Sequence, residues 1–208
     1  MTFPSVYEMT NPLTTVRPQH FWDWFSGDSL NSRWRENNIT HTGIFAMADE
    51  VDGGFSIKTP ATSGSRQSIG FGNIRPYAHD GSVCIFVFKR TTDTSFSGYT
   101  GLKYDDSNSS LLDSAVISQS TSFTNIGLYT GDASAASNTQ GSTPRDTAYH
   151  SHKIECGSAN IIATLDGVTD VTKTTNRPTK AIQPYFLSAV DTATANDIRV
   201  RYCEAYNT

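Results

Sequence analysis

The sequence predicts an all-β protein, an antiparallel sandwich of two sheets preceded by an extended N-terminal arm. Its 208 residues are rich in Ser, Thr, Asn, Asp and Gly and poor in Lys, Glu and Leu, a composition that disfavours helices. From residue 20 onward, short runs of β-branched and aromatic residues alternate with turn clusters. Asp-Gly pairs such as Asp80-Gly81 and Asp166-Gly167 indicate tight hairpins, and hairpins join antiparallel strands. At this length one sandwich fills one domain.

Residues 1–19 are predicted to form the arm, and residues 20–208 the sandwich. Pro4, Pro12 and Pro18 exclude regular structure from the arm, whose apolar side chains follow no steady period. A purely disordered segment is usually less apolar, so we expect the arm to lie on its own domain or on a neighbouring subunit. A first edge strand with an unstructured lead-in is an equal alternative. The candidate partner-binding residues are Phe3, Val6, Tyr7, Met9, Leu13 and Val16.

Twelve segments carry the composition expected of strands. The apolar run at 82–88 is unbroken, which is typical of a central strand. Residues 131–147 contain almost no apolar side chain and are predicted to form an exposed loop. The predicted strands are 20–25, 43–48, 54–59, 68–71, 81–90, 98–104, 115–120, 125–130, 150–156, 161–165, 181–189 and 197–206.

Charge, hydropathy and cysteine content limit the partners and the cellular compartment that we expect for this protein. The net charge is −4 without a basic stripe, which argues against nucleic acid and anionic membranes as partners. No stretch is apolar enough to span a bilayer and the first residues do not resemble a signal peptide, so we expect a soluble protein made in a cytoplasm and not secreted. The three cysteines are expected to be buried free thiols, with a Cys156–Cys203 disulfide as the alternative.

Three stretches resemble the concanavalin A-like lectin and glucanase superfamily, which includes laminin-G-like and laminarinase-type proteins. Residues 25–34 match the pattern F-x-G-x-x-L-x-x-x-W. Residues 149–167 resemble the superfamily's "W-H-x-Y-x-I-E" strand and the hairpin that ends in Asp-Gly, and residues 197–206 resemble its closing strand. The resemblance implies a jelly-roll sandwich over residues 20–206, and fold alone does not define function.

The chain also resembles proteins encoded among the structural genes of marine tailed bacteriophages, some of which decorate the capsid exterior. The stretches that carry this resemblance are residues 49–55, 73–77 and 203–208. It implies a virion protein on the outer surface of the capsid. Its partners would be the major capsid protein, neighbouring copies of itself in a homo-oligomer on the shell, and a glycan.

No catalytic site is predicted. Retaining glycoside hydrolysis needs two carboxyl groups about 5 Å apart, which the superfamily's hydrolases carry as E-x-D-x-x-E. The nearest match begins at Glu50 and Asp52, but Phe55 replaces the last acid and Asp52-Gly53-Gly54 is typical of a turn. We therefore expect a protein that is not an enzyme.

Metal and cofactor sites are not predicted either. His150 and His152 share one face of a strand, but two ligands do not make a zinc site and packing residues are favoured. The oxygen donors of residues 105–108 could hold calcium, although a solvated turn fits their spacing better.

Aromatic side chains offer two further candidates for a binding surface. Trp22 and Trp24 alternate with Phe21 and Phe25, so both indoles face one side of a strand, where burial in the core is favoured over a sugar-stacking platform. A second set of aromatic residues could line a concave face: Tyr99, Tyr104, Tyr129 and Tyr149.

These observations give three functional hypotheses. The first is a non-enzymatic virion structural protein that decorates and cements the capsid exterior, where many weak contacts repeat around the shell. The second is a lectin-like carbohydrate-binding module. The third is a glucanase-like polysaccharide hydrolase or lyase.

Overall fold

The computed structural model describes residues 20–26, 28–48, 53–72, 74–92, 96–107, 110–190 and 194–208. The regular structure of these residues is β throughout. The strands are β1 (His20–Asp23), β2 (Arg35–Thr40), β3 (Ile44–Met47), β4 (Phe55–Thr59), β5 (Arg66–Gly70), β6 (Ser82–Arg90), β7 (Phe96–Lys103), β8 (Ser114–Ser120), β9 (Asn125–Gly131), β10 (Ala136–Pro144), β11 (His150–Cys156), β12 (Ile161–Leu165), β13 (Val168–Lys173), β14 (Gln183–Val190) and β15 (Asn196–Asn207).

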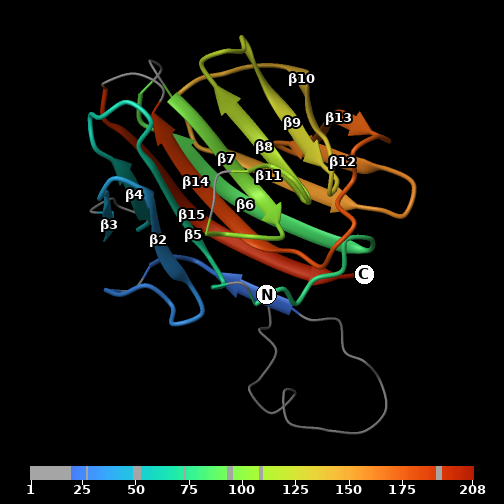
Figure 1. Cartoon of the computed structure of the whole chain (residues 1–208), viewed down its shortest axis with the longest axis horizontal. Helices are drawn as coiled ribbons and strands as arrows, with labels where there is room; N and C mark the ends of the chain where they lie inside the picture. Colours follow the sequence, from blue (N-terminus) through green and yellow to red (C-terminus); the bar gives the residue numbers. More distant parts are fainter. Residues whose placement is uncertain are drawn as a thin grey trace, which may run out of the picture.

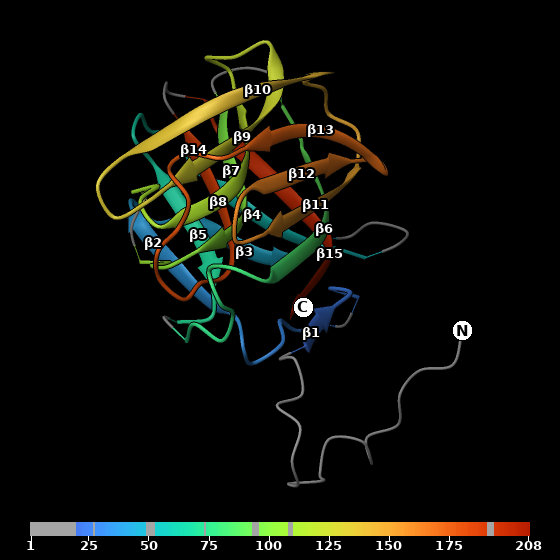
Figure 2. The ribbon, with the colours of Figure 1, turned by 90° about the vertical axis from the view of Figure 1, so that its right-hand side faces the viewer.

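The strands form two antiparallel sheets packed face to face (Figures 1 and 2). Sheet A has the order β13-β12-β11-β6-β15-β4-β3, and β1 pairs with the C-terminal half of β15. Sheet B has the order β10-β9-β8-β7-β14-β5-β2. The predicted antiparallel two-sheet sandwich is confirmed, and Figure 2 shows how β1 brings the start of the described chain beside its C-terminus.

The core lies between the sheets and is centred on Trp34. Its indole packs against four phenylalanines with ring centroids 4.9 to 5.6 Å apart: Phe21, Phe25, Phe71 and Phe186. The indole Nε1–H donates a hydrogen bond of 2.8 Å to Asp23 Oδ2, so the one polar atom of this buried ring is satisfied.

Three strands were not predicted from the sequence: β2, β10 and β13. The prediction of a loop over 131–147 is wrong, because β10 pairs with β9 along most of its length. Most of its side chains are polar and none is charged, so no apolar alternation marks it. The opposite edge of β10 is met by β13, whose Lys173 Nζ donates to the Ser137 carbonyl at 2.6 Å and whose Asp170 accepts from the Ser142 amide at 2.9 Å.

The structure also tests the predictions made for turns and for cysteines. Asp166 and Gly167 both have positive φ (47° and 84°), as a two-residue type I′ hairpin requires. Gly81 has φ 78°, whereas Asp52 lies outside the described residues.

All three cysteines are buried and free, so the alternative disulfide is not formed. Among the described residues there is no helix long and apolar enough to cross a membrane.

Close packing around Gly101 of β7, by the neighbouring strand β8 and by β11 of sheet A, predicts that Gly101→Ala is strongly destabilising. A Cβ there would come within 2.5 Å of the Ala115 carbonyl and 2.6 Å of Ile154 Cδ1, in addition to the strain of φ 149°. We expect a loss of roughly 3 kcal/mol in the free energy of unfolding, measured by urea denaturation. Gly64→Ala is the matched control, because φ is 78° but nothing lies within 4 Å, and it should cost about 1 to 2 kcal/mol. Equal losses would contradict the packing argument.

Candidate functional site

Trp22 and Trp24 lie on the outer surface of sheet A. The two residues are 51% and 55% exposed, whereas Phe21 before them and Phe25 after them are buried. The prediction that these tryptophans pack in the core is therefore wrong. Successive residues of a strand point to opposite faces, and the two phenylalanines already occupy the core face.

The indoles are joined by aromatic side chains of the neighbouring strand. Tyr202, Glu204 and Tyr206 of β15 point outward, because Cys203 and Ala205 between them belong to the core. Trp22 lies opposite Glu204, and His20 opposite Tyr206. The rings of Trp24 and Tyr202 are 4.5 Å apart between centroids, and those of His20 and Tyr206 are 5.7 Å apart. We call these five rings the aromatic strip: His20, Trp22, Trp24, Tyr202 and Tyr206.

A carboxylate is held in a fixed position within the aromatic strip. Glu204 Oε1 lies 2.8 Å from His20 Nε2, and Glu204 Oε2 accepts a hydrogen bond of 2.7 Å from the Tyr202 hydroxyl. Burial, followed by the hydrogen bond and negative charge of Glu204, raises the pKa of Tyr202 well above its usual value. The phenol therefore stays protonated and donates, while each carboxylate oxygen keeps a lone pair for a further donor.

This arrangement suits a ligand with apolar faces and hydroxyl edges. Large flat rings bind apolar surface with specific geometry, and an oriented carboxylate accepts hydrogen bonds from hydroxyl groups. A sugar ring presents both features, with C–H groups on its faces and hydroxyls at its rim. The aromatic strip is thus chemically competent to bind carbohydrate.

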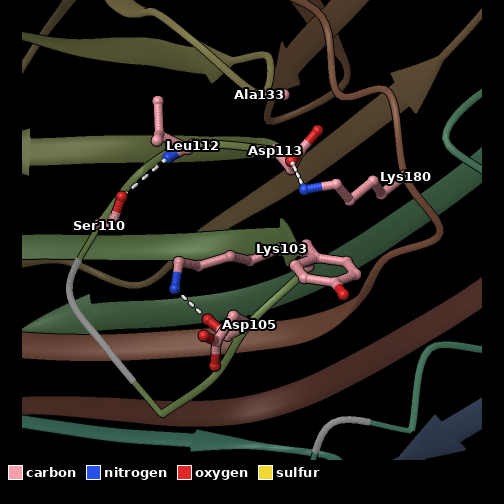
Figure 3. Close-up of a pocket in the computed structure, with 8 residues that line it drawn as sticks. Lys103, Asp105, Ser110, Leu112, Asp113, Ala133 and Lys180 are labelled. Carbon is pink, nitrogen blue, oxygen red and sulfur yellow. Dashed lines mark hydrogen bonds and ion pairs between the residues drawn. The ribbon is translucent and has the colours of Figure 1, made fainter.

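A small pocket lies at the end of sheet B, where the segment after β7 meets the segment before β14 (Figure 3). Lys180 Nζ pairs with Asp113 Oδ2 at 2.8 Å, and the buried Lys103 ammonium donates to the Asp105 carbonyl. Burial lowers the pKa of Lys103 to about 8. The cavity measures about 170 Å³, below the roughly 300 Å³ at which ligand pockets usually begin, so we assign no ligand to it.

His150 and His152 share a face of β11, as predicted, but in different surroundings. His152 is fully buried, with its ring 5.5 Å from that of Phe86 and 4.9 Å from that of Phe88, and burial lowers its pKa to about 3. His150 lies between two carboxylates, with Nδ1 2.6 Å from Asp166 and Nε2 3.0 Å from Asp146. Among the described residues, no group of three or more His, Cys, Asp or Glu side chains is arranged so that it could hold a metal ion.

The two contacts of His150 predict a pH-dependent stability. Carboxylates only accept hydrogen bonds, so both ring nitrogens donate when the imidazole is protonated. Despite desolvation, the hydrogen bonds and charges of Asp166 and Asp146 raise the pKa of His150 above 6.5. A raised pKa stabilises the fold fully below pH 6.5, and this stabilisation is lost as pH rises through the folded-state pKa.

We therefore expect the melting temperature of His150→Gln to fall below that of the wild type at pH 5.5, and the gap to shrink above pH 8. Asp166→Asn removes one of the two carboxylates. When His150→Gln is made in the Asp166→Asn protein, the difference in melting temperature that it causes should disappear at a lower pH than in the wild type. A difference that is constant between pH 5.5 and 9 would rule out the charged clamp.

The remaining candidates from the sequence do not come together as one site. In the 105–108 loop, Asp106 is buried and accepts from the Gly72 amide, and Asp105 accepts from Ser107. Tyr99 and Tyr129 pack edge to face on the outer surface of sheet B, 6.0 Å apart between centroids, whereas Tyr149 lies against cations of sheet A. Phe55 is buried in β4, and Glu50, Asp52, Asn108 and the six arm residues lie outside the described residues.

The aromatic strip was missed because its members come from the two ends of the sandwich domain. A usable signal existed in the alternation of Tyr202, Glu204 and Tyr206 with Cys203 and Ala205. Pairing of β1 with β15 could not be read from either segment alone.

The architecture defined by these two sheets is that of the concanavalin A-like jelly-roll lectins and glucanases. No protein-family model matches the chain, and a search of curated proteins finds no match. Solved structures do match. The apo Crh5 transglycosylase is 13% identical with a TM-score of 0.63, over 94% of this chain and 89% of that one. The carbohydrate recognition domain of Emp47p is 8% identical with a TM-score of 0.62, over 94% and 99%.

Two bacterial structures are similar to the same degree. A Bacillus licheniformis β-glucanase is 10% identical with a TM-score of 0.62, over 91% of this chain and 98% of that one. A Shewanella oneidensis protein of unknown function is 15% identical with a TM-score of 0.64, over 99% and 96%. At these identities the likeness establishes the fold.

The prediction that the chain is not an enzyme is contradicted by these neighbours, which include a transglycosylase and glucanases. That prediction came from a search for catalytic residues that are close in sequence. A sandwich can instead assemble side chains from strands that are distant in the chain. Strands β5, β7, β8, β9, β10 and β14 carry no Asp or Glu, so a carboxyl pair over sheet B would come from its loops or from β2.

Proposed function

We propose that this protein binds carbohydrate on the aromatic strip of sheet A. The observation that carries the proposal is the exposure of two tryptophans, Trp22 and Trp24, on one strand face beside the fixed carboxylate of Glu204. Large exposed apolar groups on a folded domain are informative because burial normally stabilises them. The lectin domains and glucanases among the solved neighbours support a carbohydrate ligand.

The proposal accounts for the polar part of the strip as well as for its rings. Trp and Tyr are enriched among the few residues that carry most of the binding energy at recognition sites, since they bury much area for few rotatable bonds. Glu204 would orient a sugar hydroxyl beside Trp22, the residue directly opposite on β1.

Glycan cleavage is a second candidate function. It is favoured by the transglycosylase and glucanases among the structural neighbours. Release of new reducing ends from any glycan that the protein binds would support it, and Glu50→Gln tests the one acidic pair that resembles a catalytic motif.

We further propose that the protein works on the capsid exterior of a tailed bacteriophage, assembled in the host cytoplasm. The major capsid protein and neighbouring copies would be its partners. The apolar arm residues Phe3, Val6, Tyr7, Met9, Leu13 and Val16 support this setting, because an arm that binds a repeated shell site gains from multivalency. Glycan binding by the aromatic strip is compatible with it.

The carbohydrate proposal predicts that Trp22→Ala and Trp24→Ala each weaken glycan binding roughly 30-fold, as expected for loss of an aromatic anchor worth about 2 kcal/mol. Dissociation constants would be measured by calorimetry with the best ligand from a glycan array. Val168→Ala is the matched control, since Val168 is 71% exposed at the start of β13 in the same sheet. Binding unchanged in both tryptophan variants would contradict the proposed site.

The capsid proposal predicts a stoichiometric component of the particle. Quantitative mass spectrometry of purified particles should give a ratio to the major capsid protein near one or a simple fraction of it. A protein lacking residues 1–19 should load poorly onto shells, whereas full-length Trp22→Ala should load normally. Full loading of the truncated protein would show that the arm is not the capsid anchor.

A further inference from the structure

Glu204 lies at the centre of the aromatic strip. Trp22 is its direct cross-strand neighbour on β1, and such a pairing brings the two Cβ atoms to about 5 Å from each other. The other rings of the strip form two pairs, one on each side of Glu204 along β15: Trp24 with Tyr202, and His20 with Tyr206. A sugar unit that covers Trp22 therefore has its rim beside Glu204, and the neighbouring units of the same chain would lie over the two ring pairs.

Two contacts within the protein fix the Glu204 carboxylate and leave part of its hydrogen-bonding capacity unused. Oε1 lies 2.8 Å from His20 Nε2, and Oε2 accepts a hydrogen bond of 2.7 Å from the Tyr202 hydroxyl. A carboxylate only accepts hydrogen bonds, so His20 carries a proton on Nε2, and each carboxylate oxygen keeps one lone pair. The Glu204 side chain is 22% exposed, so these lone pairs are accessible to a ligand that lies on Trp22.

Two acceptors held side by side are matched by two donors held side by side. A carboxylate accepts two parallel hydrogen bonds from a ligand with neighbouring donors, as it does from arginine. On a sugar ring, hydroxyl groups on two adjacent carbons provide such a pair. Equatorial hydroxyls on carbons one position further apart diverge, so only one of them reaches the carboxylate. Because His20 and Tyr202 already orient Glu204, the carboxylate is preorganised for the first kind of ligand.

We infer that the aromatic strip recognises sugar units with free hydroxyl groups on two adjacent ring carbons. Both hydroxyls donate to Glu204, one to each oxygen, while the sugar ring lies on Trp22. This inference rests on the proposed carbohydrate-binding function and specifies its ligand class.

The inference makes the linkage of the polysaccharide decisive. Interior units of a β-1,4-linked chain keep adjacent hydroxyls on carbons 2 and 3. Interior units of a β-1,3-linked chain use the oxygen of carbon 3 in the linkage and keep no adjacent pair. The ring pairs on both sides of Glu204 favour interior units over chain ends, so the two linkages should be distinguished.

The test compares β-1,4-linked with β-1,3-linked hexamers of glucose, xylose and galactose, with dissociation constants measured by calorimetry. For any of these sugars that the protein binds, the β-1,4 hexamer should bind roughly tenfold more tightly, because the β-1,3 hexamer makes one hydrogen bond fewer to a charged acceptor. Glu204→Ala should abolish this preference and leave weaker, equal binding of both hexamers on the rings. Trp22→Ala should weaken the binding of both.

Glu155→Ala is the matched control for loss of a carboxylate. Glu155 also lies on the outer face of sheet A, since Ile154 and Cys156 beside it belong to the core, but its partner is Lys153 at 2.9 Å and β6 separates its strand from β15. This variant should retain the preference for β-1,4 linkage.

Equal binding of the two linkages by the wild-type protein, or a preference that survives in Glu204→Ala, would overturn the inference about adjacent hydroxyls and leave carbohydrate binding intact. Absence of binding to every hexamer would refute both. Displacement of a bound hexamer by an equal concentration of an arginine dipeptide would show a site for guanidinium groups and overturn the inference as well.

Discussion

The hydrogen bond from the Trp34 indole to Asp23 decides which tryptophans of this protein lie inside and which lie outside. Asp23 Oδ2 accepts from Trp34 Nε1 at 2.8 Å, and Asp23 Oδ1 accepts from the Phe25 amide at 2.9 Å. Phe25 takes a positive φ of 47° and turns its ring into the core, where it lies 6.0 Å from Phe55. A partly buried hydrogen bond to a charged acceptor contributes about 2 kcal/mol, enough to hold this bend.

The consequence of that bend is an exposed aromatic surface on the outer face of sheet A. With Phe21, Phe25 and Trp34 inside, Trp22 and Trp24 have no place in the core and remain on the outer face beside Tyr202 and Tyr206. Pairing of β1 with β15 then joins the first and last strands of the sandwich. Core packing and the proposed carbohydrate recognition therefore depend on the same short strand.

The sequence predicted the fold well because strand signals are local. Alternating apolar residues identified most of the strands. The Asp-Gly pairs identified turns, including the type I′ hairpin turn at Asp166-Gly167. β10 was not predicted as a strand because most of its residues are polar on both faces, so only its pairing with β9 reveals it. The site was harder to predict. His20 and Glu204 are far apart in the sequence and become neighbours only once β1 pairs with β15. Likewise, the orientation of Trp22 depends on which neighbouring rings fill the core.

The most direct test of carbohydrate recognition by the outer face of sheet A is an NMR titration of the three indole N–H signals with an oligosaccharide that the protein binds. Trp22 and Trp24 are exposed, whereas the Trp34 N–H is buried and bonded to Asp23. We expect the signals of Trp22 and Trp24 to shift together and saturably while that of Trp34 stays in place. Binding that leaves both exposed indoles unshifted would place the carbohydrate site elsewhere and contradict this account.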